Sequence, residues 1–246
     1  MAGRRPAGAR QAPRSQHFLR TRALAAQLVV DACIGPDDLV LDLGAGSGRL
    51  TAELAARARR VLAVELDPSW AARLGGRWPN VDVFEGDATR LPLPRSTFRV
   101  VSNLPFHRTT DLLHVLLDDP TSGLARADLV VEWGVAFRYG VPWPSTLNGV
   151  TWGAFYETTI TRRLSRIEFD PPPATDAGVL VFTRRPSSLV PVKQASAFRS
   201  FAARGFRRGL RSVASSSAIA RVGHRSLTAR ELDAYQWAEL FRRSSA

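Results

Sequence analysis

The segment Leu39–Gly48 reads LVLDLGAGSG and decides the fold of this chain. Its first residues are apolar apart from Asp42, which is typical of a short buried strand. Three glycines then alternate with small residues, and an apolar segment with helical spacing follows over 47–59. Glycines in such a turn let the backbone pass close to a ligand, and the helix that follows presents free amide groups. The segment therefore indicates a nucleotide-type α/β fold, with a plain strand-to-helix turn as the alternative.

Strand-like and helix-like segments alternate on both sides of this turn. We expect further strands over 60–67, 81–87, 98–103 and 127–137, and helices over 21–33, 68–78 and 109–119. Short links between such segments predict a parallel, doubly wound sheet of the Rossmann-like type. Two later strand-like segments, 157–169 and 177–186, follow each other directly and predict an antiparallel hairpin at the sheet edge.

The charge of the chain is concentrated at its two ends. The net charge is +12 with an isoelectric point near 11.4, and all but one of the 34 cations are arginines. Residues 1–30 carry six arginines and no acid, and residues 184–246 have a net charge of +10, which leaves −4 for residues 31–183. Basic ends around an acidic middle predict a nucleic-acid partner, with an anionic lipid or a merely soluble basic surface as the alternatives.

Composition divides the chain into three parts. Residues 1–15 are rich in arginine, proline and glycine and are predicted to form a basic disordered tail. Residues 16–186 contain the strand and helix pattern of an α/β domain. From residue 187 apolar residues become sparse and arginines dense, which predicts a small basic helical domain over 187–246, with its best helix over 227–241. Four arginines of this domain are expected to contact RNA: Arg204, Arg207, Arg208 and Arg211.

Several other classes of protein are disfavoured by the sequence. Cys33 is the single cysteine, so no intramolecular disulfide or thiolate metal cluster can form, and a reducing, cytoplasmic setting fits. No apolar run approaches the roughly 18 residues that a membrane helix needs. No histidine or acid cluster has the spacing of metal ligands. We therefore expect no metal and no membrane contact.

Acidic and amide side chains stand at three strand ends after the glycine turn. Glu65 ends the second strand, where a carboxylate can accept both hydroxyls of a ribose. Asp87 ends the third strand, where it can accept from an adenine amino group, and Asn103 ends the fourth. Ligands of open α/β sheets bind beyond the carboxyl ends of the strands, so these side chains are expected to share one crevice with Gly44 and Gly46.

Two cofactors fit such a crevice, NAD and S-adenosylmethionine. NAD binding favours a GxGxxG turn that holds a pyrophosphate. Here Asp42 directly precedes the glycines, and its charge would repel a diphosphate but attract the sulfonium and ammonium groups of S-adenosylmethionine. The sequence therefore favours S-adenosylmethionine.

Six motifs in order resemble the ribosomal-RNA adenine-N6 methyltransferases, and among them most closely the erythromycin-resistance 23S rRNA enzymes. They are SQHFL (15–19), DLGAGSG (42–48), VELD (64–67), GDA (86–88), NLPF (103–106) and FDPPP (169–173). The resemblance covers about residues 16–185 and implies that residues 16–186 form an S-adenosylmethionine-binding catalytic domain. NLPF together with FDPPP is the part that other methyltransferases lack.

The chemistry of an exocyclic adenine amine accounts for NLPF. The lone pair of this amine is delocalised into the ring, and two acceptors that take both N–H groups would localise it on the nitrogen. The side-chain oxygen of Asn103 and the carbonyl of Leu104 can supply these acceptors. Pro105 stiffens the turn, and Phe106 offers a flat face on which an extruded base can stack.

The resemblance also assigns roles outside NLPF. It implies that Phe169 covers the other face of the base and that His17 and Leu19 lie over the cofactor. It further implies a monomeric enzyme that methylates an adenine of 23S rRNA, free or in an assembling large subunit, and confers resistance to macrolides, lincosamides and streptogramin B. Two rival functions stay open: a 16S rRNA dimethyladenosine transferase, and a non-catalytic RNA-binding or transcription factor on the same fold.

Overall fold

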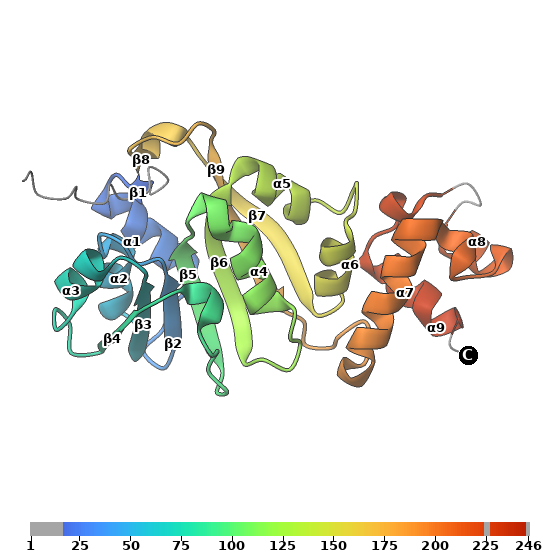
Figure 1. Cartoon of the computed structure of the whole chain (residues 1–246), viewed down its shortest axis with the longest axis horizontal. Coiled ribbons are helices and arrows are strands. Elements are labelled where there is room, and N and C mark those ends of the chain that lie inside the picture. Colours follow the sequence, from blue (N-terminus) through green and yellow to red (C-terminus); the bar gives the residue numbers. More distant parts are fainter. Residues whose placement is uncertain (1–16, 224–226, 245–246) are drawn as a thin grey trace, which may run out of the picture.

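The computed structural model describes residues 17–223 and 227–244. Its centre is a seven-stranded sheet in the order β4-β3-β2-β5-β6-β9-β7 (Figure 1). The strands are β2 (Leu39–Leu43), β3 (Arg60–Glu65), β4 (Val81–Glu85), β5 (Phe98–Asn103), β6 (Leu124–Glu132), β7 (Tyr156–Leu164) and β9 (Ala177–Arg184). The strands from β4 to β6 are parallel, and β9 runs antiparallel to both of its neighbours. The expected Rossmann-like sheet with an antiparallel pair at its edge is confirmed.

Helices pack against both faces of this sheet. They are α1 (Arg22–Asp31), α2 (Arg49–Ala55), α3 (Pro68–Leu74), α4 (Thr109–Leu117), α5 (Trp133–Gly140) and α6 (Leu147–Gly153). Successive residues of a strand point to opposite faces. Leu41 of β2 accordingly belongs to the same core as Leu113 of α4, whereas Val40 belongs to the core that contains Leu28 of α1.

A second, two-stranded sheet joins two motifs that lie far apart in the sequence. β1 (Phe18–Leu19) pairs antiparallel with β8 (Phe169–Asp170). The Arg20 N–H extends this pairing by donating to the Glu168 carbonyl at 2.7 Å. The small sheet brings Phe18 and Leu19 of the SQHFL motif next to the start of the FDPPP motif, close to α1 (Figure 1).

The strand expected over 127–137 is shorter than predicted. β6 ends at Glu132, and Trp133–Gly140 forms α5. The prediction was wrong because a continuous apolar run does not distinguish a buried strand from a buried helix. The helix lies tightly on β9, since a Cβ atom on Gly178 would come within 2.8 Å of Cβ of Ala136. This close packing depends on tertiary context that the local sequence does not contain.

The C-terminal helix expected over 227–241 is also divided. A short 3₁₀ turn, η6 (Ala229–Glu231), precedes α9 (Ala234–Ser244). Asp233 separates the two, because its side chain accepts from the Gln236 N–H at 2.9 Å and so caps the start of α9. The helical pattern of the sequence extends through this cap and therefore hides it.

Three helices form the end of the molecule farthest from α3 (Figure 1). They are α7 (Ala195–Arg208), α8 (Ser216–Val222) and α9. Their aromatic residues Phe198, Phe201 and Trp237 belong to the same hydrophobic core as Trp152 of α6, so these helices are packed firmly onto the sheet domain. The domain boundary at residue 187 stays a prediction. The tail predicted over 1–15 lies outside the described residues, and within them no helix has the length and apolarity to cross a membrane.

Candidate active site

A cleft with about 860 Å³ of empty space, partly open to solvent, lies at the carboxyl ends of the central strands. The predicted site residues that line it are His17, Gly44, Gly46, Glu65, Asp87, Asn103, Leu104, Pro105 and Phe106. Two other predicted residues, Leu19 and Phe169, lie outside its wall. The structure thus brings most of the predicted residues together, while their individual roles stay predictions.

The glycine turn passes unusually close to two other walls of the cleft. Gly44 and Gly46 have φ angles of +79° and +51°, a backbone region that side chains rarely adopt. A Cβ atom on Gly46 would come within 2.5 Å of the Phe18 ring, and one on Gly44 within 3.2 Å of the Pro105 ring. Both glycines are therefore required by the turn conformation and by the packing of the cleft wall.

Glu65 is a buried acceptor held in one orientation. Its side chain is only 3% exposed. One carboxylate oxygen accepts from the Gly46 N–H at 2.7 Å and the other from the Asp67 N–H at 2.8 Å. Each carboxylate oxygen has a second lone pair, so Glu65 can accept two further donors from a ligand in the cleft.

Asp87 follows the end of the neighbouring strand β4, and its neighbours favour its ionised form. One of its oxygens accepts from the Thr89 hydroxyl at 2.7 Å and from the Thr89 N–H at 2.9 Å, and the other lies 3.5 Å from Nη2 of Arg108. The bond from the Thr89 hydroxyl, helped by the Thr89 N–H and by Arg108, holds the pKa of Asp87 below its usual range against a smaller opposing effect of burial. Asp87 is therefore available as a charged acceptor.

Asp42 lies beneath the glycine turn and is 1% exposed. Burial raises the pKa of Asp42 to about 7, the Thr51 hydroxyl at 2.7 Å opposes this rise, and the nearby charge of Glu65 adds to it. A smaller cavity connects Asp42 with Gly44, Leu19 and Asn103. A cation next to this cavity would stabilise the ionised form of Asp42.

The side-chain amide of Asn103 has one polar atom that is hydrogen-bonded and one that is not. Its Nδ2 donates to the carbonyl oxygen of His17 at 2.8 Å, and this bond fixes the orientation of the amide because a carbonyl only accepts. Its Oδ1 is buried and has no hydrogen-bond partner among the described residues. An unsatisfied buried acceptor costs about 1–3 kcal/mol and is uncommon in folded proteins. The arrangement therefore indicates that a donor from a ligand completes Asn103.

The aromatic residues of the site are arranged differently from the implied sandwich. Phe106 lines the cleft next to His17, with ring centroids 5.5 Å apart. Phe169 is fully buried and meets Phe106 edge to face, with centroids 6.1 Å apart and an angle of 69° between the rings. A base between two rings needs parallel planes about 7 Å apart, twice a van der Waals contact. In this structure Phe169 therefore supports the Phe106 ring, and a sandwich would require one of the rings to move.

Leu19 also differs from its implied place over the cofactor. It is buried, and its carbonyl accepts from the Arg49 guanidinium. Its neighbour Phe18 lines the main cleft instead. Strand alternation explains the exchange, because successive residues of β1 point in opposite directions.

Sequence reasoning left nine residues of the cleft wall unassigned, among them Phe18, Leu66, Thr89 and Arg108. Leu66 directly follows Glu65 and is 63% exposed, so it presents an apolar surface to the cleft. The positions of Phe18 and Leu66 beside predicted residues were usable signals. Nothing in the sequence pattern indicated Thr89 or Arg108.

The four arginines predicted to bind RNA lie far along the chain from this cleft. Arg204, Arg207 and Arg208 are exposed on α7, and Arg211 is exposed on the turn that follows. Within the described part of the chain none of the four forms an ion pair with a carboxylate. Among the described residues no group of three or more histidine, cysteine or acidic side chains could hold a metal ion.

Comparison with known proteins agrees with this geometry. The family model described as ribosomal RNA adenine dimethylase matches residues 11–233. An rRNA adenine N-6-methyltransferase of Bacillus licheniformis is 34% identical over 190 residues, which cover 76% of this chain and 66% of that protein. The mycinamicin-resistance protein MyrB of Micromonospora griseorubida is 36% identical over 177 residues, which cover 71% of this chain and 56% of that protein. Small-subunit rRNA methyltransferases are also among the relatives.

A solved structure shows the same fold over nearly the whole chain. The crystal structure of the 23S rRNA methyltransferase ErmE superposes with a TM-score of 0.81 at 25% identity, covering 93% of this chain and all of that one. The sheet and the cleft at its strand ends define a Rossmann-like methyltransferase. The chain belongs to the ribosomal RNA adenine dimethylase family. It spans less than two thirds of the length of the two curated relatives described above.

Proposed function

We propose that this protein methylates the N6 amine of an adenine in 23S rRNA with S-adenosylmethionine as methyl donor, and so confers resistance to macrolides, lincosamides and streptogramin B. The observation that carries the proposal is the buried, unsatisfied Oδ1 of Asn103 in the wall of the cleft. An adenine amine is a neutral donor with two N–H groups. It can therefore donate to Oδ1 of Asn103, for which the described residues supply no donor.

The cleft residues fit S-adenosylmethionine. The free lone pairs of Glu65 suit the two ribose hydroxyls, and the ionised Asp87 suits the adenine amino group. Gly44 and Gly46 allow the amino-acid part to approach the backbone, with the acid Asp42 beneath them. When bound there, the cofactor supplies an electrophilic methyl group on a sulfonium.

The residues of NLPF prepare the target amine. Oδ1 of Asn103 and the carbonyl of Leu104 accept its two N–H groups, which localises the nitrogen lone pair for attack. Pro105 limits the conformations of the turn, and Phe106 stacks on the extruded base with Phe169 supporting its ring. The methylated amine is acidic and releases its proton to water, so the site needs no strong base.

Two observations favour 23S over 16S rRNA. The structure of ErmE, a 23S rRNA methyltransferase, aligns with 93% of this chain at a TM-score of 0.81, whereas a dimethyladenosine transferase of Plasmodium falciparum aligns over the same share at 0.74. The mycinamicin-resistance protein MyrB is 36% identical to this chain, whereas the small-subunit rRNA methyltransferases mentioned above are 33% and 31% identical. We further propose that the enzyme acts as a cytoplasmic monomer on free rRNA or an assembling large subunit. In this proposal the helices within residues 187–246 bind RNA phosphates.

The decisive experiment is methyl transfer to separated RNAs. Purified protein is incubated with methyl-labelled S-adenosylmethionine and either 23S or 16S rRNA, and the modified base is located by primer extension. We expect label in 23S rRNA at a single adenine. Label confined to 16S rRNA would establish the dimethyladenosine transferase instead. Tight RNA binding without any transfer would establish the non-catalytic RNA-binding factor.

A further inference from the structure

Arg108 lies between two short turns that line the cleft. It is the last residue of the 3₁₀ turn η2 (Phe106–Arg108), which follows the Asn103–Pro105 strand end. The 3₁₀ turn η1 (Ala88–Arg90), directly after Asp87, lines the same cleft through Ala88 and Thr89. The Arg108 side chain lines the cleft and is 33% exposed.

The guanidinium of Arg108 connects η1 with the start of α4 through contacts with three residues. Nη2 donates to the Thr89 hydroxyl at 3.0 Å and lies 3.5 Å from Oδ2 of Asp87. Nε donates to Asp111 of α4 at 3.0 Å. A guanidinium is a rigid planar fork, so these contacts fix the distance between η1 and the start of α4. A lysine ammonium has no such geometry.

The position of Arg108 is unfavourable for the helix that it precedes. Arg108 is the N-cap residue of α4 and makes no capping hydrogen bond. N-cap positions favour serine, threonine, aspartate or asparagine, and the helix dipole disfavours a cation there. A residue that opposes its local structural preference is expected where a functional contact is gained. An ordinary exposed ion pair would contribute little and would not explain this choice.

The contacts of Arg108 determine how Asp87 faces the cleft. Thr89 holds one carboxylate oxygen through two hydrogen bonds, and Arg108 approaches the other oxygen. Together these contacts restrict rotation of the carboxylate, and Asp87, Thr89 and Arg108 all line the cleft. Arg108 does this from the same short turn that carries Phe106.

We propose that Arg108 is a positioning residue, which fixes the Asp87 carboxylate in the orientation that accepts the cofactor's adenine amine and ties it to the turn that carries the base-stacking Phe106. The inference rests on the proposed function, because it assigns Asp87 to the cofactor. Arg108 itself touches no reacting atom in this proposal.

A double-mutant cycle on binding of S-adenosylhomocysteine, measured by calorimetry without RNA, tests this role. We expect Arg108→Ala to weaken binding about tenfold, and Asp87→Asn to weaken it at least as much. In the Asp87→Asn background, Arg108→Ala should have little further effect, because Arg108 acts through the carboxylate. Arg108→Lys should restore binding only in part, since an ammonium cannot span three acceptors.

Two further variants separate this role from a general loss of structure. Asp111→Asn loosens Arg108 from outside the cleft and should weaken binding in the same direction but less. Arg95→Ala removes an exposed arginine outside the cleft wall and should bind like the wild type. Wild-type affinity in both Arg108→Ala and Asp111→Asn, or fully additive effects of Arg108→Ala and Asp87→Asn, would overturn the inference. Failure of the wild-type protein itself to bind S-adenosylhomocysteine would contradict the proposed function instead.

Discussion

Replacing Asn103 should lower the activity of the protein far more than its stability. Its Oδ1 is unsatisfied in the fold, so truncation removes an unpaired acceptor together with one hydrogen bond to His17. We predict that Asn103→Ala lowers the single-turnover rate of methyl transfer by about 100-fold or more, as the loss of one preorganised polar group does elsewhere. The free energy of unfolding should change by only about 1 kcal/mol. Affinity for S-adenosylhomocysteine should stay within a few-fold of the wild type, and an unchanged transfer rate would refute the proposed role.

The rings of Phe106 and Phe169 are in contact, but we expect their replacement by alanine to change different properties of the protein. Phe106→Ala removes a cleft-facing ring, so the KM for RNA should rise by the equivalent of about 1–3 kcal/mol while the melting temperature changes little. Phe169→Ala empties a fully buried site and should lower the free energy of unfolding by about 3–5 kcal/mol. Denaturant titration and steady-state kinetics on both variants test the distinction. If Phe169→Ala folds normally and loses only RNA affinity, the two-ring sandwich implied by the sequence is the better description.

Asp42 gives the protein a stability that depends on pH. The folded-state pKa of about 7 lies above the ordinary aspartate value of about 3.9, so between these pH values the folded state holds a proton that the unfolded state has lost. The contribution of Asp42 to the free energy of unfolding therefore falls as pH rises through this window and levels off above it. We predict that Asp42→Asn, without ligand, gains roughly 2–4 kcal/mol relative to the wild type between pH 4 and pH 8. Parallel stability curves for the two proteins would show that Asp42 is not the titrating group.

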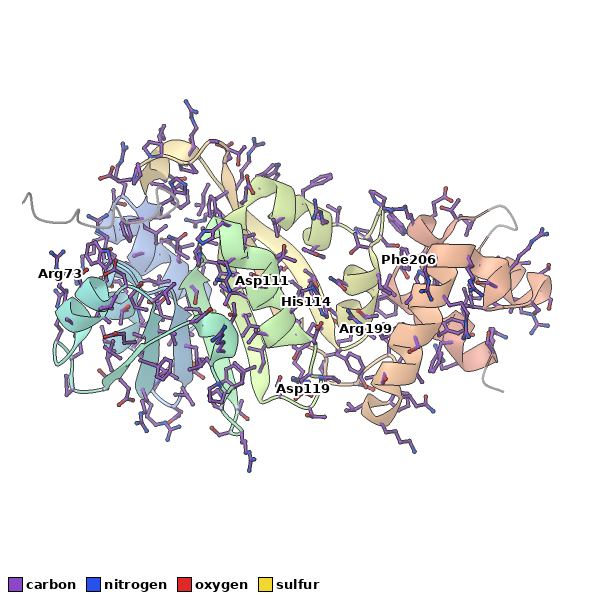
Figure 2. The ribbon with its side chains drawn as sticks, in the orientation of Figure 1. Arg73, Asp111, His114, Asp119, Arg199 and Phe206 are labelled. Carbon is purple, nitrogen blue, oxygen red and sulfur yellow. The ribbon has the colours of Figure 1, made fainter. Side chains whose placement is uncertain are left out.

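At the scale of elements, α4 and α6 are joined to α7 by one polar network. His114 of α4 lies 2.8 Å from Asp118 and 3.1 Å from the Asn148 amide of α6, and Arg199 of α7 donates to Asn148 at 3.3 Å. Figure 2 labels His114 and Arg199, which approach α6 from its two sides. Since α4 begins directly after NLPF, this network ties the base-binding turn to the C-terminal helices.

Trp152 tests whether this network is structural. Its indole N–H donates to Asp118 at 2.8 Å, and the side chain is 1% exposed. We predict that Trp152→Phe lowers the free energy of unfolding by about 1–3 kcal/mol, because Asp118 loses a donor in a partly buried place. RNA affinity, measured by filter binding, should be unchanged. A selective loss of RNA affinity at wild-type stability would make Trp152 a stacking residue instead.

The elements that the sequence predicts well are those with local signals. β5 was expected at its observed bounds, and α1 starts at the Thr21 cap, whose side chain accepts from the Leu24 N–H. The glycine turn and the strand-end acids were found because alternation and turn chemistry are local. The α5 helix, the cap at Asp233 and the place of Phe169 were missed. The α5 helix and the place of Phe169 depend on packing between segments distant in the sequence, which no local pattern encodes. The cap at Asp233 is local, because the side chains of Asp233 and Gln236 each accept from the other residue's N–H, and this D-x-x-Q pattern was a usable signal.

At the scale of the whole molecule, negative and positive charge are concentrated in different parts of the chain. The cleft wall carries the acidic residues Glu65 and Asp87 with Arg108 as its one arginine, whereas the net charge of residues 184–246 is +10. A cationic cofactor and a polyanionic RNA are therefore favoured at different ends of one molecule. The distribution was visible in the sequence, but the structure was needed to tell paired arginines from unpaired ones.

The C-terminal helices offer a matched test of that difference. Arg207 and Arg208 are exposed at the end of α7 and form no carboxylate ion pair within the described residues, whereas Arg242 and Arg243 of α9 both pair with Glu239 at 2.7 and 2.6 Å. Replacing either pair by alanine removes the same charge. We predict that Arg207→Ala with Arg208→Ala weakens RNA binding and lowers the slope of log K against log salt by about 0.7–0.9 for each RNA phosphate that the protein no longer neutralises.

The Arg242→Ala, Arg243→Ala protein is the control for net charge. Both of its guanidinium groups pair with Glu239, which offsets one of their two charges, so its salt slope should remain closer to that of the wild type than the slope of the α7 variant does. Both variants are measured with the same rRNA fragment over a series of salt concentrations. Equal weakening in the two variants would mean that RNA responds to overall charge, and the assignment of α7 as an RNA-binding surface would then fail. Weakening confined to the α7 variant supports a defined track of phosphate-binding arginines, because an unpaired arginine that neutralises a phosphate releases a counterion from the RNA.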